Sequence, residues 1–115
     1  MTTYTGSCHC KQVRFEVTAD VAKASTCNCS ICSRVGWTMF SVEPSAFKLL
    51  AGDDAQTDYQ FNTKSMHHLF CKTCGVHAYG RWEAPTGERI IVNAHCLDGL
   101  DAYQVPTSMF DGKSY

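Results

Sequence analysis

Short stretches of the chain alternate between hydrophobic and polar residues with a period of two. The alternation is clearest where Val13, Phe15 and Val17 are separated by charged or polar residues, which is the pattern of a strand with one buried face. Other short runs, rich in aromatic and β-branched residues, predict further strands at 37–42, 47–49, 59–61, 66–70, 76–82 and 89–94. Gly, Asn, Asp and Pro residues separate these runs, so the pattern predicts a mainly β protein with antiparallel strands.

Helical periodicity is nearly absent. The best helical turn covers residues 30–35, with Ser30 as the expected N-cap, and residues 100–103 favour one further turn. No internal repeat, low-complexity segment or linker rich in Pro, Gly and Ser divides the sequence. We therefore expect residues 1–115 to form one domain with little helix, and Trp37 and Trp82 to lie in its core.

Composition and charge exclude several classes of protein. The chain has 115 residues, of which 44% are hydrophobic and 18% are charged, and its formal net charge is −1. This balance argues against a disordered acidic chain and against a nucleic-acid binder, which needs clustered Lys and Arg. No apolar run approaches the roughly 20 residues that cross a bilayer, and no signal peptide is visible at the N-terminus. We therefore expect a soluble, cytoplasmic protein with neither nucleic-acid nor membrane partners.

The number of cysteines is unusually high, at eight. Seven of them form three groups: Cys8 and Cys10 (C-x-C), Cys27, Cys29 and Cys32 (C-x-C-x-x-C), and Cys71 and Cys74 (C-x-x-C-G). The cytosol keeps thiols reduced, and the hydrophobic content suffices for a core without disulfides. The grouping therefore favours metal binding over redox or disulfide use.

The first and last groups suit one closed structural zinc site. Side chains two residues apart on a strand leave the same face, so Cys8 and Cys10 can bind together. In the C-x-x-C-G turn, Gly75 lets the backbone bend so that Cys71 and Cys74 point at one ion. Four such sulfurs satisfy a tetrahedral zinc, and the energy of binding it becomes folding energy.

The middle group offers only three thiolates, from Cys27, Cys29 and Cys32, with no adjacent fourth ligand. Three protein ligands and one open position are typical of catalytic zinc, and the open position of a thiolate-rich site suits a substrate thiol. The alternative is a second closed site, completed by one of the remaining side chains: Cys96, His67, His68, His77 or His95.

Each remaining candidate also has a plainer interpretation. Cys96 is expected to be a buried thiol acting as a small hydrophobe. His9 should point away from its neighbouring ligands, and of the adjacent His67 and His68 one should face in and one out. Surface roles are favoured over binding of a substrate carboxylate for the arginines Arg34, Arg81 and Arg89.

Taken in order, these motifs resemble one known family. Residues 6–10 followed by 13–15, then 27–32, then 70–75, and finally Val92-Asn93 with Leu97-Asp98 are similar to the glutathione-dependent formaldehyde-activating enzymes, whose domain centromere protein V shares. The resemblance covers about residues 4–103. It implies a β-tent fold, with small antiparallel sheets organised around zinc. It also implies two zinc ions per chain: Cys8, Cys10, Cys71 and Cys74 match the structural ligands, and Cys27, Cys29 and Cys32 match the ligands of the substrate-facing ion.

The activity that the resemblance implies is that of a carbon–sulfur lyase, which interconverts S-(hydroxymethyl)glutathione with glutathione and formaldehyde. The expected partners are thus a small thiol and a small aldehyde. The competing hypothesis is a non-catalytic binding module with two structural zinc sites, and a third is a redox protein without bound metal. Exposed edges of a β protein would also allow a homodimer.

Overall fold

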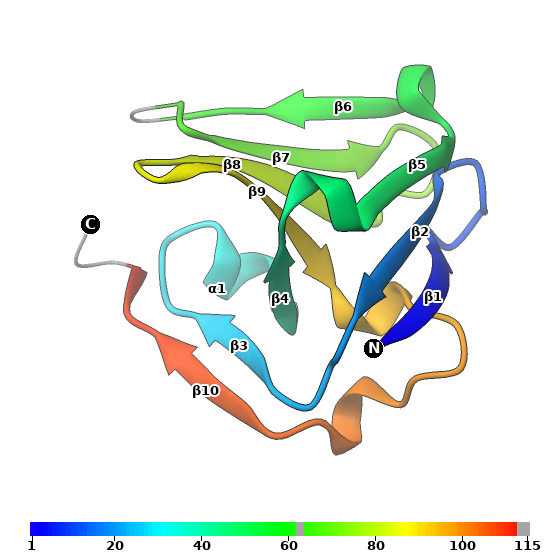
Figure 1. Ribbon diagram of the computed structural model, residues 1–115. Helices are drawn as coiled ribbons and strands as arrows, with labels where there is room; N and C mark the ends of the chain where they lie inside the picture. The colour runs from blue at the N-terminus through cyan, green and yellow to red at the C-terminus, as the bar shows by residue number, and fades with distance from the viewer. Residues whose placement is uncertain (62–63, 113–115) are drawn as a thin grey trace.

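The protein consists almost entirely of short strands, as the computed structural model shows for residues 1–61 and 64–112 (Figure 1). The strands in this part of the chain are β1 (Thr2–Ser7), β2 (Arg14–Ala19), β3 (Ala24–Cys27), β4 (Met39–Val42), β5 (Phe47–Ala51), β6 (Gln56–Tyr59), β7 (Met66–Cys71), β8 (Tyr79–Ala84), β9 (Gly87–Asn93) and β10 (Thr107–Phe110). The helical segments there are α1 (Cys32–Val35) and the 3-10 turns η1 (Pro44–Ala46), η2 (Asp53–Ala55), η3 (Ala94–Cys96) and η4 (Ala102–Gln104). The prediction of a mainly β protein with little helix is confirmed.

The strands form two sheets. One has three strands in the order β1-β2-β5, and the other has seven in the order β10-β3-β4-β9-β8-β7-β6. Neighbouring strands are antiparallel except β3 and β10, which run parallel. The larger sheet is therefore mixed rather than purely antiparallel. A single bridge between Gly6 and Leu97 links the end of β1 to the segment after β9.

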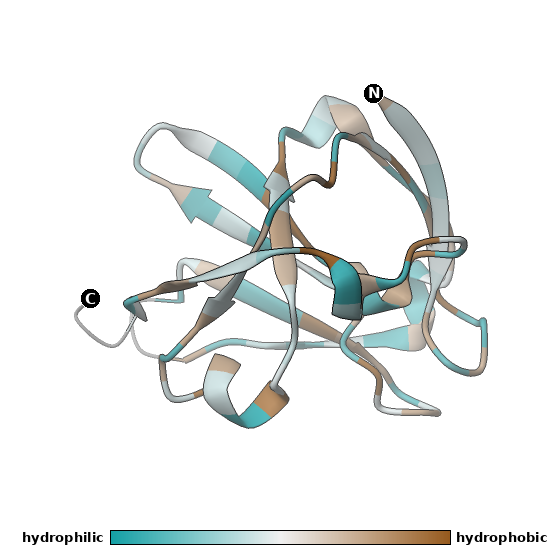
Figure 2. Cartoon of the chain, turned by 90° about the horizontal axis from the view of Figure 1, so that it is seen from below, coloured by the Kyte–Doolittle hydropathy of each residue, from teal (hydrophilic) through white to brown (hydrophobic). Residues whose placement is uncertain are grey.

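The core lies where the two sheets meet. Phe15 and Val17 on β2 and Val92 on β9 are completely buried. Phe47 on β5 stacks on Phe15 with ring centroids 5.2 Å apart and lies 4.7 Å from the ring of Tyr79 on β8, so aromatic contacts join the sheets. Hydrophobic and hydrophilic residues alternate along several strands, as Figure 2 shows. This arrangement follows from the period of two in the sequence.

Most predicted strands are present, with shifted ends. The run at 37–42 becomes a strand only from Met39, and the run at 76–82 only from Tyr79, because residues 72–78 first lead out of the turn at the third cysteine group. The predicted turn at 85–87 connects β8 to β9. The sequence pattern missed β1, β3 and β10, whose residues are mostly small, polar or exposed.

Two finer predictions are wrong. Ile31, not Ser30, is the N-cap of α1, and no side chain caps the first turn. The carbonyl of Ser30 accepts a 2.8 Å hydrogen bond from the Arg34 side chain. Trp82 is 37% exposed, whereas Trp37 is buried as expected.

Within the described residues, no helix has both the length and the apolar character needed to cross a membrane.

Candidate metal sites

Cysteines from the first and last groups meet at one point between the sheets. Cys8 and Cys10 follow β1, Cys71 ends β7, and Cys74 lies three residues further on. Their four sulfur atoms all lie within 4.8 Å of one another. The Cys8–Cys10 and Cys10–Cys71 sulfur distances are 3.7 and 3.5 Å. Sulfurs bound about 2.3 Å from one tetrahedral zinc would be about 3.8 Å apart, so this group fits the ion.

Backbone turns of similar design present the two pairs. The N–H of Val13 donates to the Cys8 sulfur at 3.4 Å, and the N–H groups of Thr73 and Cys74 donate to the Cys71 sulfur at 3.4 and 3.5 Å. Such donors stabilise a thiolate and fix its direction. Lys11, which follows Cys10, and Gly75, which follows Cys74, both have a positive φ, and this conformation turns the chain around the sulfurs.

The environment favours loss of the proton at two of these sulfurs, those of Cys71 and Cys74. At Cys10 the Gln12 backbone N–H acts to lower the pKa, but desolvation and the neighbouring thiols raise it to about 11. The Cys74 backbone N–H lowers the pKa of Cys71. Although desolvation acts to raise it, the backbone N–H groups of Cys10 and Val76 lower the pKa of Cys74 to about 6. Cys8 and Cys71 are also nearly fully buried within the hydrophobic core. The group is therefore built into the packing of the molecule.

The middle cysteines form a second group from six consecutive residues. Cys27 ends β3, Cys29 lies in the following loop, and Cys32 begins α1. Their sulfur atoms also lie within 4.8 Å of one another, and the Cys32 N–H donates to the Cys29 sulfur at 3.4 Å. The single turn of α1 ends at Gly36, whose left-handed backbone closes the turn onto the carbonyl of Cys32. A short strand, a loop and one helical turn thus suffice to gather three sulfurs.

This group has one buried cysteine where the four-cysteine group has two, and it is less complete. Cys27 and Cys29 are half-buried, and only Cys32 is buried. Within residues 1–61 and 64–112, no fourth His, Cys, Asp or Glu ligand atom joins the three sulfurs. Burial raises the pKa of Cys32 well above its usual range, and the Trp37 indole acts against that rise. A cation among the three sulfurs would offset the cost of burying this thiolate, so the donor set fits a metal ion with one position left for another ligand.

The glutathione-dependent formaldehyde-activating enzyme family has a sequence model that matches residues 3–113 of this chain. The chain belongs to this family. The matched range includes all seven grouped cysteines. The predicted resemblance is therefore confirmed over nearly the whole chain.

Individual family members show the same likeness. A protein of Emericella nidulans named "Putative glutathione-dependent formaldehyde-activating enzyme" is 32% identical over 112 residues, and one of the same name from Phaeosphaeria nodorum is 31% identical over 106 residues. These matches cover 92% and 88% of this chain but 52% and 51% of the two relatives, so the chain spans about half their length. A crystal structure of a Rhodobacter sphaeroides protein matches with a TM-score of 0.79 and 32% identity, covering 90% of this chain and 99% of that one.

A buried stack of rings adjoins the three-cysteine group, and the sequence pattern did not reveal it. The Trp37 indole, which faces the Cys32 thiol, stacks on His77 with ring centroids 4.2 Å apart, and His77 lies 5.5 Å from His68. His68 Nδ1 and both ring nitrogens of His77 are buried without a hydrogen-bond partner among the described residues. Burial lowers the pKa of His77 to about 4 and also lowers that of His68. Both imidazoles are therefore neutral near pH 7.

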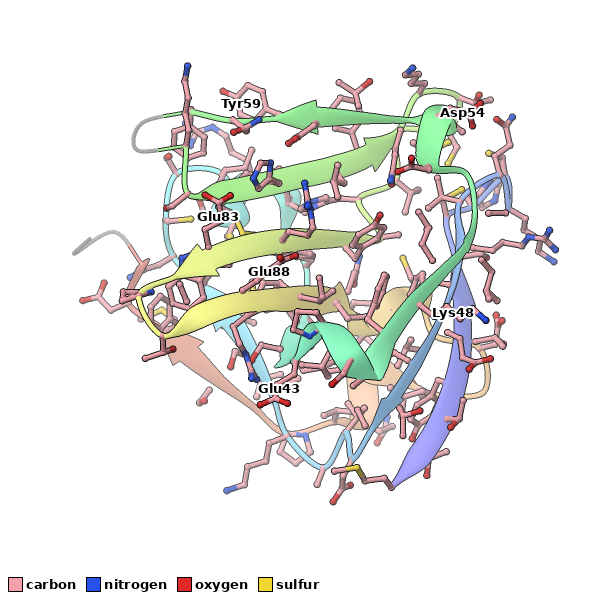
Figure 3. All side chains as sticks on the ribbon, turned by 45° about the horizontal axis from the view of Figure 1, so that its top comes forward. Glu43, Lys48, Asp54, Tyr59, Glu83 and Glu88 are labelled. Atoms are coloured by element: carbon pink, nitrogen blue, oxygen red, sulfur yellow. The ribbon has the colours of Figure 1, made fainter. Side chains whose placement is uncertain are left out.

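None of the other predicted candidates joins either group of sulfurs. His9 is exposed, and His95 contacts Thr38 at the surface. His67 and His68 face opposite ways, as expected for neighbours on a strand. Figure 3 shows Glu83 on β8; its carboxylate lies 3.5 Å from His67 Nε2.

The lone cysteine and the arginines also have local roles. Cys96 is half-buried beside the four-cysteine group, where burial, followed by the charges of Cys8 and Cys74, raises its pKa to about 11. Its sulfur is not among the four that lie within 4.8 Å of one another, so its position sets it apart from the ligands. Each of three arginines has a surface partner: Arg34 the carbonyl of Ser30, Arg81 the carboxylate of Glu88 and Arg89 the hydroxyl of Ser41.

Proposed function

We propose that this protein is a zinc-dependent carbon–sulfur lyase that joins a small thiol such as glutathione to formaldehyde and releases it again. The observation that carries the proposal is the contrast between two groups of sulfurs in one chain. Four sulfurs, from Cys8, Cys10, Cys71 and Cys74, can complete a tetrahedron, whereas three, from Cys27, Cys29 and Cys32, leave a position open. The names of the relatives support a thiol and an aldehyde as substrates.

In the proposed reaction the thiol sulfur forms a bond to the carbonyl carbon of formaldehyde. The π electrons of the carbonyl move to its oxygen, and the proton lost by the thiol ends on that oxygen, giving a hydroxymethyl thioether. The reverse reaction breaks the same carbon–sulfur bond. A zinc ion bound to the three cysteines supplies a soft Lewis acid that favours the thiolate form of the substrate.

Residues of this chain account for the rest of the site. Cys27, Cys29 and Cys32 would hold the ion, and the Cys32 N–H directs the Cys29 sulfur. With three thiolates the zinc site would carry a formal charge of −1, which would weaken its hold on an added thiolate and keep that sulfur nucleophilic. Trp37 and His77 form a buried, uncharged wall behind Cys32, which limits the access of water from that side.

Replacing zinc by cobalt(II) tests this proposal, because thiolate-to-cobalt absorption reports each ligand change. Titration of glutathione into protein with two cobalt ions should change the spectrum of one ion, and the Cys29→Ser variant should lose that ion and the response. Exchange of labelled formaldehyde with the hydroxymethyl thioether, followed by NMR, should be accelerated by the zinc protein and not by Cys29→Ser. If neither cobalt responds to thiols, both sites are structural and the protein is a binding module.

A further inference from the structure

The end of the described chain runs beside the three-cysteine group. Strand β10 pairs in parallel with β3, and its last residue, Phe110, is the register partner of Cys27. Figure 1 shows the two strands side by side, both running toward the loop that connects β3 to α1. The parallel pairing thus brings residues about 80 positions apart in the sequence to the first of the three sulfurs.

Two hydrogen bonds hold this segment to the loop that carries the ligands. The backbone N–H of Asn28 donates to the carbonyl of Phe110 at 3.3 Å, and its side-chain amide donates to the Asp111 carboxylate at 2.8 Å. Asn28 lies between Cys27 and Cys29. Asn28 therefore couples the position of the segment to the position of the sulfurs, in addition to the pairing of β10 with β3.

Gly112 makes the closest approach. A Cβ atom placed on Gly112 would lie 2.5 Å from the Cys27 sulfur and 3.1 Å from the Cys29 Cβ, both too short for normal contacts. The backbone of Gly112 is not in the left-handed region, so any residue could adopt its conformation. Glycine is needed there for space alone, because the main chain passes directly against the Cys27 sulfur.

We propose that residues Phe110–Gly112 form one wall of the thiol-binding site and limit the size of the thiol that reaches the ion. This inference rests on the proposed function, since it concerns the ligand of the open position. A wall this close to the Cys27 sulfur and the Cys29 Cβ restricts groups attached to the carbon next to the substrate sulfur. Primary thiols fit, and thiols branched at that carbon are excluded.

Cysteine and penicillamine are suitable probes, because they carry the same charges and differ by two methyl groups on the carbon that bears the sulfur. Their affinities are measured by cobalt absorption on the full chain. The wild-type protein should bind cysteine at least about tenfold more tightly, since one methyl group in a closely fitting site changes binding by roughly 10-fold or more. In Gly112→Ala the added Cβ should displace the wall from sulfurs that the metal holds in place, and this preference should fall by at least about fivefold.

Two changes at Asp111 accompany this variant. Asp111→Asn keeps the shape and an acceptor for Asn28, and it should retain the wild-type preference. Asp111→Ala removes the acceptor without adding atoms near the sulfurs, and it should weaken the preference as Gly112→Ala does. If Gly112→Ala loses its second cobalt ion, the preference of Asp111→Ala for cysteine over penicillamine tests the proposed wall instead.

The outcomes separate this inference from the proposed function. If Gly112→Ala and Asp111→Ala keep both ions and an unchanged preference for cysteine, the proposal that residues 110–112 form a wall is refuted, while the proposed thiol site stands. Equal binding of cysteine and penicillamine to the wild-type protein refutes the wall in the same way. A wild-type protein in which neither thiol alters either cobalt spectrum overturns the proposed function and this inference with it.

Discussion

The two groups of cysteines use the same donor atom for different purposes. The four-cysteine group joins segments next to both sheets, with Cys10 and Cys71 61 positions apart, and two of its members, Cys8 and Cys71, belong to the hydrophobic core while Cys10 is exposed. The three-cysteine group comes from six consecutive residues, and two of its members are half-buried. A site assembled from distant segments stabilises the whole fold when it binds metal, whereas a local site can lose its ion while the rest of the protein stays folded. Substitutions in the two groups should therefore have unequal effects.

The largest effect is expected for Cys71→Ser. Cys71 is 1% exposed and accepts two backbone N–H groups, so its replacement removes a buried zinc ligand and leaves three thiolates, of which that of Cys8 is buried, without their ion. We expect loss of several kcal/mol of unfolding free energy and no cooperative unfolding transition. Circular dichroism during heating, with metal content measured by mass spectrometry, checks this.

Cys96→Ser is the matched control for that change. Cys96 adjoins the same group but is not one of its four sulfurs, and its thiol stays protonated. The variant should keep both metal ions and lose about 1 kcal/mol of stability. Loss of a metal ion from Cys96→Ser would show that the four-cysteine group is wrongly assigned.

In contrast to Cys71→Ser, Cys29→Ser should abolish thiol binding while changing stability only slightly. Cys29 is half-buried in a loop, so the variant should lose the second ion and all thiol binding but only about 1 kcal/mol of unfolding free energy. Metal content should fall from two ions per chain to one, with a cooperative melting curve retained. Two ions in purified Cys29→Ser, or an unfolded variant, would contradict the local character of this group.

The sequence allowed both groups of cysteines to be predicted, because their spacing reflects local turns. Cys8 with Cys10 and Cys71 with Cys74 are short-range pairs, and the structure brings them together as expected. Strands with a clear alternation, such as β2, were also predictable.

The remaining parts of the site depend on long-range contacts that have no local pattern. Strand β10 is exposed at all four residues and carries no alternation, so nothing in its sequence indicates parallel pairing with β3. The stacking of Trp37 on His77 likewise joins residues 40 positions apart. The requirement for glycine at Gly112 arises because the segment after β10 approaches the Cys27 sulfur closely, and it becomes visible only once the pairing of β10 with β3 is known.

An acid-dependent effect is expected at the ring stack behind the three-cysteine group. Burial lowers the pKa of His77 to about 4 from 6.5, so between these pH values the unfolded chain binds a proton that the folded protein does not. The folded state therefore loses stability as the pH falls through this range, by an amount on the order of 3 kcal/mol, and this penalty is absent above it.

His77→Phe keeps the stacking on Trp37 and removes the titrating group. The stability of the wild-type protein relative to this variant should fall by about 2 kcal/mol between pH 6.5 and pH 5. Urea denaturation of both proteins at each pH measures the difference, and effects of acid on the thiolates cancel because both proteins share them. A difference that does not vary with pH would show that His77 is not neutral and buried in the folded protein.

The smallest effects should come from the residues that follow each pair in the four-cysteine group. Lys11 and Gly75 both have positive φ values, 67° and 76°, but only Gly75 adopts this conformation without strain. Lys11→Gly should raise the unfolding free energy by up to about 1 kcal/mol, and Gly75→Ala should lower it by about 1 kcal/mol. A Cβ on Gly75 would meet no atom within 4 Å, so the loss reports backbone strain alone.

Gly36→Ala, beside the three-cysteine group, introduces the same strain at φ 69° with equally open space. Since that group is local, the strain there can be relieved by fraying of α1, and global stability measured by urea denaturation should change by less than half as much. Equal losses for Gly36→Ala and Gly75→Ala would show that both groups of cysteines are equally coupled to the fold, and the contrast between them would be lost.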